Sequence, residues 1–132
     1  YMESPDHITL SEIGKAIQLV QSGLIWKPGS AERHLRRRVN RGHLPITATL
    51  HDYESLIQTV VHQPLAQVYL YWHSTVEQRV AYVAIVGTVT DASWLVMFAF
   101  TGVLESAYIV ERPQYYLSEP EFEWIGRVED II

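Results

Sequence analysis

Cysteine is absent from this chain of 132 residues. Disulfides, a thiolate nucleophile and a zinc site built on thiolates are therefore excluded, and the absence is typical of the reducing cytoplasm, where we expect the protein to work. The six histidines show neither the His-x-x-x-His nor the His-Glu-x-x-His spacing of a metal site, and no glycine-rich loop for nucleotide phosphates occurs. We therefore expect neither a metal ion nor a cofactor.

Long hydrophobic runs and an excess of positive charge are missing too. The apolar run Trp94–Phe100 has the length of a strand, not of a membrane span, so we expect no membrane partner. The chain carries 10 Lys or Arg against 15 Asp or Glu, a formal net charge of −5. Its hydrophobic content of 48% is that of a globular protein and excludes a disordered one.

A short basic segment, Ser30–Leu44, stands out against this acidic background. Between Lys27 and His43 there are six Lys or Arg and one acid, Glu32. The segment contains five arginines and two histidines: Arg33, Arg36, Arg37, Arg38, Arg41, His34 and His43.

The acids gather at the other end of the chain. From Glu105 to Ile132, seven Asp or Glu stand against Arg112 and Arg127. This asymmetry is typical of a protein whose basic face binds a polyanion such as nucleic acid. It is equally typical of an acidic tail that folds back onto the basic segment, or of copies that pair head to tail.

The periodicity of the sequence predicts helices in the first half of the chain. A capping box, Thr9-x-x-Glu12, opens an apolar repeat that ends at Gly23. A second helix begins at an N-cap Ser30, carries the apolar stripe Ala31, Leu35 and Val39, and ends before Gly42; a third begins near Asp52 and ends before Pro64.

The second half of the chain predicts strands joined by short links, which favour antiparallel pairing. They are Gln67–His73, Arg79–Gly87, Ser93–Phe100 and Val103–Val110, and Glu121–Val128 reads as a further short strand or a turn. The expected fold is a single α+β domain over 1–132. Helices at about 9–62 pack on one face of a four- to five-stranded antiparallel sheet at about 67–110, followed by a tail at 111–132.

The helix of the basic segment carries the main candidate site. His34, Arg37, Arg38 and Arg41 are spaced i, i+3, i+4 and i+7, so they share one helical face. The planar guanidinium suits a phosphate, and neighbouring arginines lower the pKa of His34 and His43, which favours neutral imidazoles that act as bases.

The last predicted strand adds hydroxyl groups to the candidate site. Alternation places Leu104, Ser106 and Tyr108 on one face and Val103, Glu105 and Ala107 on the other. We therefore expect Ser106 and Tyr108 to line the open face of the sheet together.

The order of these elements resembles a known family. Arg33-His34-Leu35, Gly42-His43 and Asp52-Tyr53, then Pro64, Trp94-Leu95-Val96 and Glu105-Ser106-Ala107-Tyr108, are similar to the metal-independent ribonuclease superfamily of barnase, EndoU, colicin and RelE-like proteins. The likeness is to its phage and polymorphic-toxin branches and covers residues 8–110.

The resemblance implies a site and a reaction. RNA is cleaved by general acid/base transesterification, with its own 2′-OH as the nucleophile and no metal. His34, Arg38, His43, Ser106 and Tyr108 are then the catalytic residues, with His34 as general acid or base, and Arg37 and Arg41 bind phosphate. In this reading the chain is a ribonuclease-like domain of toxin or phage type.

Two other functions remain open at this point, and with them the question of whether the protein is an enzyme. One is a non-catalytic interaction or oligomerising module that docks an acidic partner or inhibitor on its arginine-rich helix. The other is a small-molecule pocket on the open sheet face, lined by Tyr69, Tyr71, Tyr82 and Trp94. The partners to consider are thus RNA, an acidic protein and a second copy of the chain.

Overall fold

The computed structural model describes residues 7–132, in which helices come first and most of the sheet follows. The helices of the first half are α1 (Leu10–Ser22), α2 (Ser30–Asn40) and α3 (Leu50–Val61), with the two-residue strand β1 (Ile25–Trp26) before α2. The second half contains β2 (Gln67–Ser74), β3 (Arg79–Val89), β4 (Ala92–Phe98), β5 (Val103–Ile109), α4 (Pro113–Tyr116), β6 (Phe122–Arg127) and α5 (Val128–Ile131).

Local capping sets the starts of the helices. The predicted capping box of Thr9 and Glu12 is present, and a second box formed by Thr49 and Asp52 starts α3 earlier than we expect from the sequence. The N-cap of α2 is Gly29, not Ser30 as predicted. Gly29 has φ of 75°, a left-handed conformation that glycine adopts without strain, and it leaves Ser30 as the buried first residue of the helix.

The six strands form one mixed sheet in the order β1-β5-β4-β3-β2-β6. The α+β class is confirmed, but the prediction of a four- to five-stranded, purely antiparallel sheet is wrong. The strand β1 pairs in parallel with β5 at Val103 and Leu104, and two residues are too few to show an alternating pattern in the sequence. In the tail, β6 pairs antiparallel with β2, so Glu121–Val128 contains a short strand, one of its two predicted alternatives, and β1 is the strand that the prediction lacked.

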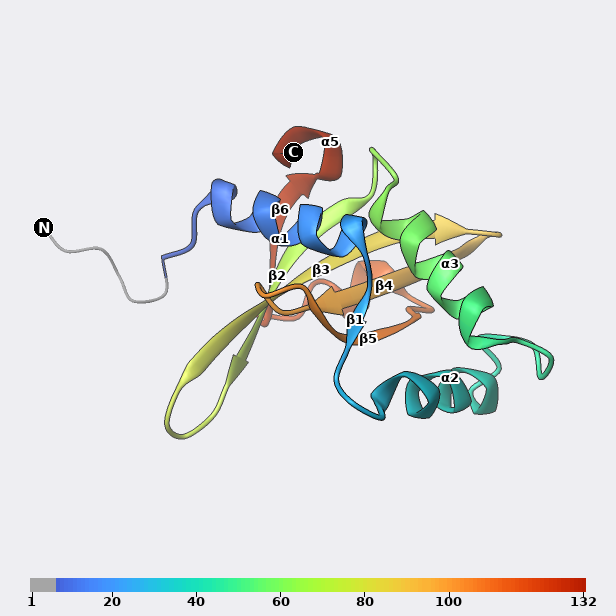
Figure 1. Ribbon diagram of the computed structural model, residues 1–132. Coiled ribbons are helices and arrows are strands. Elements are labelled where there is room, and N and C mark those ends of the chain that lie inside the picture. The colour runs from blue at the N-terminus through green and yellow to red at the C-terminus, as the bar shows by residue number, and fades with distance from the viewer. Residues whose placement is uncertain (1–6) are drawn as a thin grey trace, which may run out of the picture.

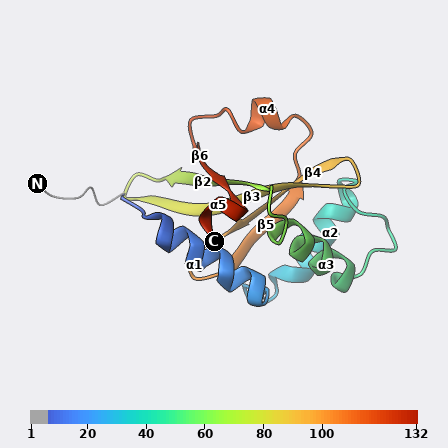
Figure 2. The ribbon, with the colours of Figure 1, turned by 90° about the horizontal axis from the view of Figure 1, so that it is seen from above.

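Helices cover one face of the sheet, as predicted (Figures 1 and 2). Residues of α1 and α3, among them Ile17 and Ile57, pack with Ile85, Trp94 and other inward side chains of the strands in the main hydrophobic core. Figure 2 shows α4 on the opposite side of the sheet from these helices.

The sheet face on the α4 side has a smaller apolar cluster of its own. It consists of Ala84, Val86, Leu95, Met97 and Val110, with Leu117 and several tyrosines packed against it. Because both faces of β3 and β4 are buried, these strands read as continuous apolar runs and not as strict alternation. The face that we expect to be open is therefore covered over its middle.

A β-bulge in β5 changes the predicted faces of that strand. Met97 pairs with Ser106 but Phe98 pairs with Leu104, so Glu105 is an extra residue without a partner on β4. The bulge shifts the alternation by one residue. Leu104 therefore joins Ala107 in the main core, and the prediction that it shares a face with Ser106 and Tyr108 is wrong.

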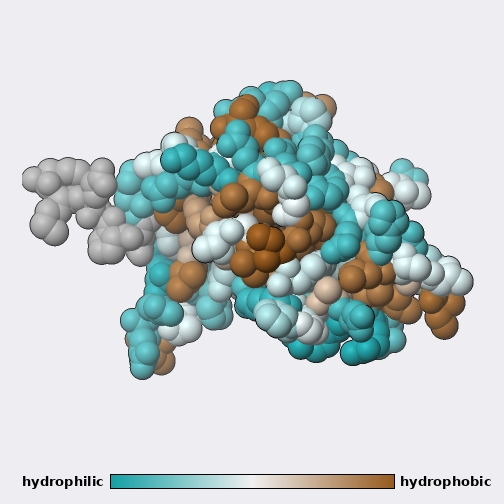
Figure 3. Space-filling view, in the orientation of Figure 1, coloured by the Kyte–Doolittle hydropathy of each residue, from teal (hydrophilic) through white to brown (hydrophobic). Residues whose placement is uncertain are grey.

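The surface seen in Figure 3 has its apolar atoms gathered over α1 and β1, where Leu19 and Ile25 are about half exposed. Polar atoms surround this area on most sides (Figure 3).

Between residues 7 and 132, no helix combines the length and the apolar character that crossing a membrane requires.

Candidate anion-binding site

A pocket of about 530 Å³ brings six of the seven predicted site residues together. We call it the arginine pocket. It lies where α2 and the loop after it meet β5 and α4, and it is lined by Arg37, Arg38, Arg41, His43, Ser106, Tyr108, Ile109, Glu111 and Tyr116.

Arg38 is the buried cation of this pocket, with 4% of its surface exposed. Its Nη1 lies 3.2 Å from Nδ1 of His43, and its guanidinium lies 5.6 Å from the ring centroid of Tyr108. Its Nε is buried and has no hydrogen-bond partner within the described residues. Burial lowers the pKa of Arg38, and the charges of Arg41 and Arg37 lower it further.

No carboxylate in the described part of the chain forms a salt bridge with Arg38. A buried charge is costly unless an opposite charge or a full set of hydrogen bonds compensates it. The free protein therefore holds a cation whose electrostatic complement is missing, which is the condition that favours binding of an anion.

The burial of Arg38 departs from the predicted apolar stripe of α2. Ala31, Leu35 and Val39 are only half-buried, whereas the two buried residues of the helix are Ser30 and Arg38. The helix thus turns one arginine toward β5 and leaves Arg33, Arg36, Arg37 and Arg41 exposed.

The turn after α2 places His43 against Arg38. Gly42 has φ of 75°, and the main-chain N–H groups of His43 and Leu44 both donate to the carbonyl oxygen of Arg38, at 2.9 and 3.3 Å. This left-handed turn brings the imidazole back over the end of the helix. The ring also contacts Trp94 edge-on, with 6.1 Å between centroids.

Two donors converge on a single nitrogen of His43. Its Nδ1 lies 3.2 Å from Nη1 of Arg38 and 3.2 Å from the main-chain nitrogen of Ile109. Guanidinium and amide nitrogens only donate, so Nδ1 accepts both bonds and the ring is neutral with its proton on Nε2. Burial lowers the pKa of His43, as do the charges of Arg38 and Arg41, while Glu111 raises it.

Side chains take the place of a neighbouring strand along the edge of β5. β1 pairs only with Val103 and Leu104, so the groups further along have no strand beside them on that side. The hydroxyl of Tyr53 donates to the carbonyl oxygen of Ala107 at 2.6 Å, and His43 accepts from Ile109. Burial raises the pKa of Tyr53 to about 12. The arginine pocket is thus built onto a strand edge that side chains complete.

Two phenols form another wall of the arginine pocket. The hydroxyls of Tyr108 and Tyr116 lie 2.6 Å apart, and their rings meet edge-on with 6.2 Å between centroids. Burial raises the pKa of Tyr108, and the hydrogen bond to Tyr116 raises it further. The phenol of Tyr108 therefore carries its proton at neutral pH.

Sequence reasoning missed the apolar Ile109 and two polar residues of the pocket, Glu111 and Tyr116. Both polar residues lie in the tail, where the absence of a long periodic pattern hides the short helix α4. The available signal is Pro113, which occupies the first turn of that helix, a position that proline favours.

His34 lies apart from the other six predicted residues. Its ring is half-buried against Trp26 of β1, with 5.6 Å between centroids, and it does not line the arginine pocket. Its Nδ1 is buried without a partner among the described residues. Burial lowers the pKa of His34, and the charges of Arg37, Arg38 and Arg33 lower it further. The structure thus puts His34 beside β1, away from the pocket where the expected chemistry would take place.

The last part of the acidic tail, β6 and α5, lies away from the basic helix. The outermost strand β6 stands at the opposite end of the sheet from β5, and α5 is well separated from α2 (Figure 1). Arg127 pairs with Glu129 and Asp130 at 3.4 and 3.2 Å, and Lys27 pairs with Glu105 at 2.8 Å. Over residues 7–132, no salt bridge joins α2 to the tail, so the arginines are not neutralised in that way.

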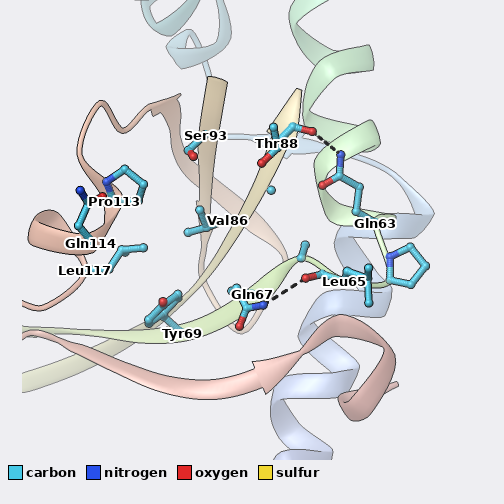
Figure 4. A pocket seen from close by; sticks show the side chains of 13 residues that line it. Gln63, Leu65, Gln67, Tyr69, Val86, Thr88, Ser93, Pro113, Gln114 and Leu117 are labelled. Atoms are coloured by element: carbon cyan, nitrogen blue, oxygen red, sulfur yellow. Dashed lines mark hydrogen bonds between the residues drawn. The ribbon is translucent and has the colours of Figure 1, made fainter. Parts of the chain in front are cut away.

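A second pocket, of about 640 Å³, lies over β2, β3 and β4 and has no charged residue in its lining. Figure 4 shows Pro113, Gln114 and Leu117 on one side of it, facing Val86 and Tyr69 of the sheet. Of the four aromatic residues that we expect in a pocket on this face, only Tyr69 lines it. Trp94 belongs instead to the core under the helices.

Within the described range, no three His, Cys, Asp or Glu side chains are grouped so that they could hold a metal ion. No family model matches the sequence, and no curated protein and no solved structure shows a significant similarity to it. The resemblance to the ribonuclease superfamily therefore stays a prediction that depends on the motif residues.

Proposed function

We propose that the arginine pocket binds a phosphate of RNA and that the protein is a metal-independent endoribonuclease of toxin or phage type. The observation that carries this proposal is Arg38, a buried cation bordering the pocket without a carboxylate partner in the described chain. An anion in the pocket would supply the missing charge.

A polymeric anion fits better than a small one because the basic surface extends beyond the pocket. Arg37 and Arg41 line it, and Arg33 and Arg36 are exposed on the same helix. Several arginines along one helix can contact successive phosphates of a nucleic-acid backbone. The absence of cysteine fits a cytoplasmic site of action, where RNA is at hand.

The groups in the pocket match the needs of transesterification. The 2′-oxygen of the RNA attacks the adjacent phosphorus, its proton passes to a base, and the P–O5′ bond breaks as the departing oxygen takes a proton. The products are a 2′,3′-cyclic phosphate and a 5′-hydroxyl.

We assign the base to Glu111, the one carboxylate of the arginine pocket, and the acid to the phenol pair of Tyr108 and Tyr116. Arg38, with Arg37 and Arg41, stabilises the charge that develops on phosphorus-bound oxygens. Ser106 helps to orient the phosphate. His34 has no role in this assignment, because it does not line the pocket.

The test is incubation of the protein with a labelled RNA of mixed sequence in EDTA. We expect 2′,3′-cyclic phosphate ends, and a rate lower by about 100-fold or more in Arg38→Gln, since loss of one charge-stabilising donor has an effect of that size. The matched control, Arg36→Gln, removes the same charge from an exposed position of the same helix. No cleavage together with no salt-dependent RNA binding would contradict the proposal.

The second candidate is a non-catalytic module that docks an acidic protein. The exposed arginines of α2, which form no salt bridge within residues 7–132, favour it. The acidic end of a second copy is one such partner, because the two ends of the molecule are of opposite charge. Salt-sensitive self-association or capture of an acidic inhibitor, without affinity for RNA, would favour this function over the ribonuclease.

A further inference from the structure

The imidazole of His43 sits between the buried cation of the arginine pocket and the edge of the sheet. We infer that His43 is a positioning residue that holds the guanidinium of Arg38 against β5 through Nδ1, in the orientation in which Arg38 meets a phosphate. The inference rests on the proposed function for the phosphate, but the contact itself is present in the free protein.

The pattern of donors excludes His43 as a general base in this arrangement. Nδ1 is occupied by the N–H groups of Arg38 and Ile109, and Nε2 already carries the proton of the neutral ring. If Nδ1 were protonated, its N–H group would face the N–H groups of Arg38 and Ile109, and both hydrogen bonds would be lost. The Nε2–H group donates but does not accept, so neither ring nitrogen is available to take a proton.

The surroundings of His43 keep its ring in place. The left-handed turn at Gly42 bonds its main chain to the end of α2, and Trp94 packs edge-on against it. The groups that act electrostatically on it are Arg38 from α2, Arg41 directly after that helix and Glu111 from the segment after β5. A ring held on several sides fixes the long, flexible side chain of Arg38, which reduces the entropy that a ligand would otherwise have to remove.

Two amide substitutions separate positioning from proton transfer. The oxygen of Asn stands two bonds from Cβ, as Nδ1 does, whereas the oxygen of Gln stands one bond further out, as Nε2 does. Neither amide takes up a proton at neutral pH. In His43→Asn the acceptor for Arg38 is retained, and in His43→Gln it is misplaced.

We expect His43→Asn to bind and cleave RNA within about threefold of the wild type, and His43→Gln to lose about tenfold or more in RNA affinity, the size expected for one hydrogen bond to a charged group. A general acid or base contributes about 100-fold or more to the rate. A loss of that size in kcat in both variants, with KM unchanged, would therefore overturn the inference. Wild-type behaviour of both variants would overturn it too.

A measurement without ligand separates this inference from the proposed function. In ¹⁵N-labelled protein at pH 7.5, the ring should show a protonated Nε2 and an unprotonated, hydrogen-bonded Nδ1. The side-chain signals of Arg38 should be sharp in the wild type and in His43→Asn but averaged in His43→Gln. A proton on Nδ1, or Arg38 signals that are the same in both variants, would reject the positioning role whether or not the protein binds RNA.

Discussion

The main-chain groups at the two ends of the sheet find their hydrogen-bond partners in different ways. At the β6 end the main chain completes the sheet, since β6 pairs with β2 over Phe122–Arg127 and the nearby charges pair among themselves at the surface. At the β5 end, β1 covers two residues only, and the side chains of Tyr53 and His43 satisfy the groups beyond them.

This difference explains where the chemistry gathers. Where another strand pairs with a strand edge, main-chain groups satisfy the hydrogen bonds. Few polar side chains are then needed there in a fixed orientation. An edge closed by side chains needs polar residues that are buried, oriented and hydrogen-bonded, and such residues have altered pKa values and restricted protonation states. Arg38 and His43 are of this kind, whereas Arg127 is an exposed partner of exposed acids.

The largest effect on this difference between the two ends of the sheet is expected from Arg38→Met. This substitution removes the buried charge at the β5 end but keeps much of the side-chain volume. We expect RNA cleavage to fall by about 100-fold or more. The free energy of unfolding of the ligand-free protein should rise by about 1 kcal/mol, because an uncompensated buried charge is replaced by an apolar group. Chemical denaturation and the cleavage assay measure the two effects. Arg36→Met is the control, in which the loss of an exposed arginine should leave stability unaltered and reduce cleavage much less than the loss of Arg38 does. A clear loss of stability in Arg38→Met would show that the charge is compensated in the free protein.

Next in size is the loss of a hydrogen bond on the β5 edge. Tyr53→Phe leaves the carbonyl oxygen of Ala107 buried without its donor, which should lower the free energy of unfolding by about 1–3 kcal/mol. Tyr69→Phe is a matched control, since no hydrogen bond of that half-buried hydroxyl to a described residue is present. Equal stability of the two variants would mean that the hydroxyl of Tyr53 contributes nothing to closing the edge.

Acidification should weaken the fold through the two histidines on the basic side. Burial and neighbouring arginines lower the pKa of His34 and of His43 in the folded protein. The unfolded chain then binds more protons as the pH falls below about 6.5, so the free energy of unfolding decreases from pH 7.5 toward pH 5. The slope should be smaller in a His34→Gln, His43→Asn double variant. An unchanged slope would place the acid sensitivity elsewhere.

The smallest effect is expected at the other end of the sheet. Arg127→Gln removes the exposed pairs with Glu129 and Asp130, and solvent screening makes such surface pairs contribute little to stability. We expect a free energy of unfolding close to that of the wild type and unaltered cleavage of RNA. A loss of activity in this variant would mean that the acidic end takes part in function and would sharpen the case for head-to-tail pairing.

Local signals in the sequence predicted much of the fold. The capping box at Thr9, the glycine stop at Gly23 and the apolar strands are effects of neighbouring residues, so the first helix and the four central strands lie where we expect them. The two-residue β1 and the bulge at Glu105 depend on tertiary pairing and leave no periodic pattern. For that reason the parallel pair and the true face of Leu104 were not predictable.

In the candidate site, too, local signals were visible in the sequence and tertiary contacts were not. Helical spacing groups Arg37, Arg38 and Arg41, which line one pocket, because residues three or four apart share a direction. It also groups His34 with them, but spacing does not tell which neighbour a side chain meets, and the structure places His34 against Trp26 of the unpredicted β1. Glu111 and Tyr116 reach the pocket through the course of the tail, which only the folded chain reveals.

The extra residue in β5 divides that strand into two halves that are out of phase. Val103 and Leu104 pair with β1, and Leu104 packs in the core, whereas Ser106 and Tyr108 line the arginine pocket. Substitutions on either side of Glu105 can therefore accumulate separately, so that ligand preference can drift without repacking the interior. Deletion of Glu105 would therefore remove the bulge and leave a regular strand, in which Leu104 still faces the core and Ser106 and Tyr108 still face the pocket.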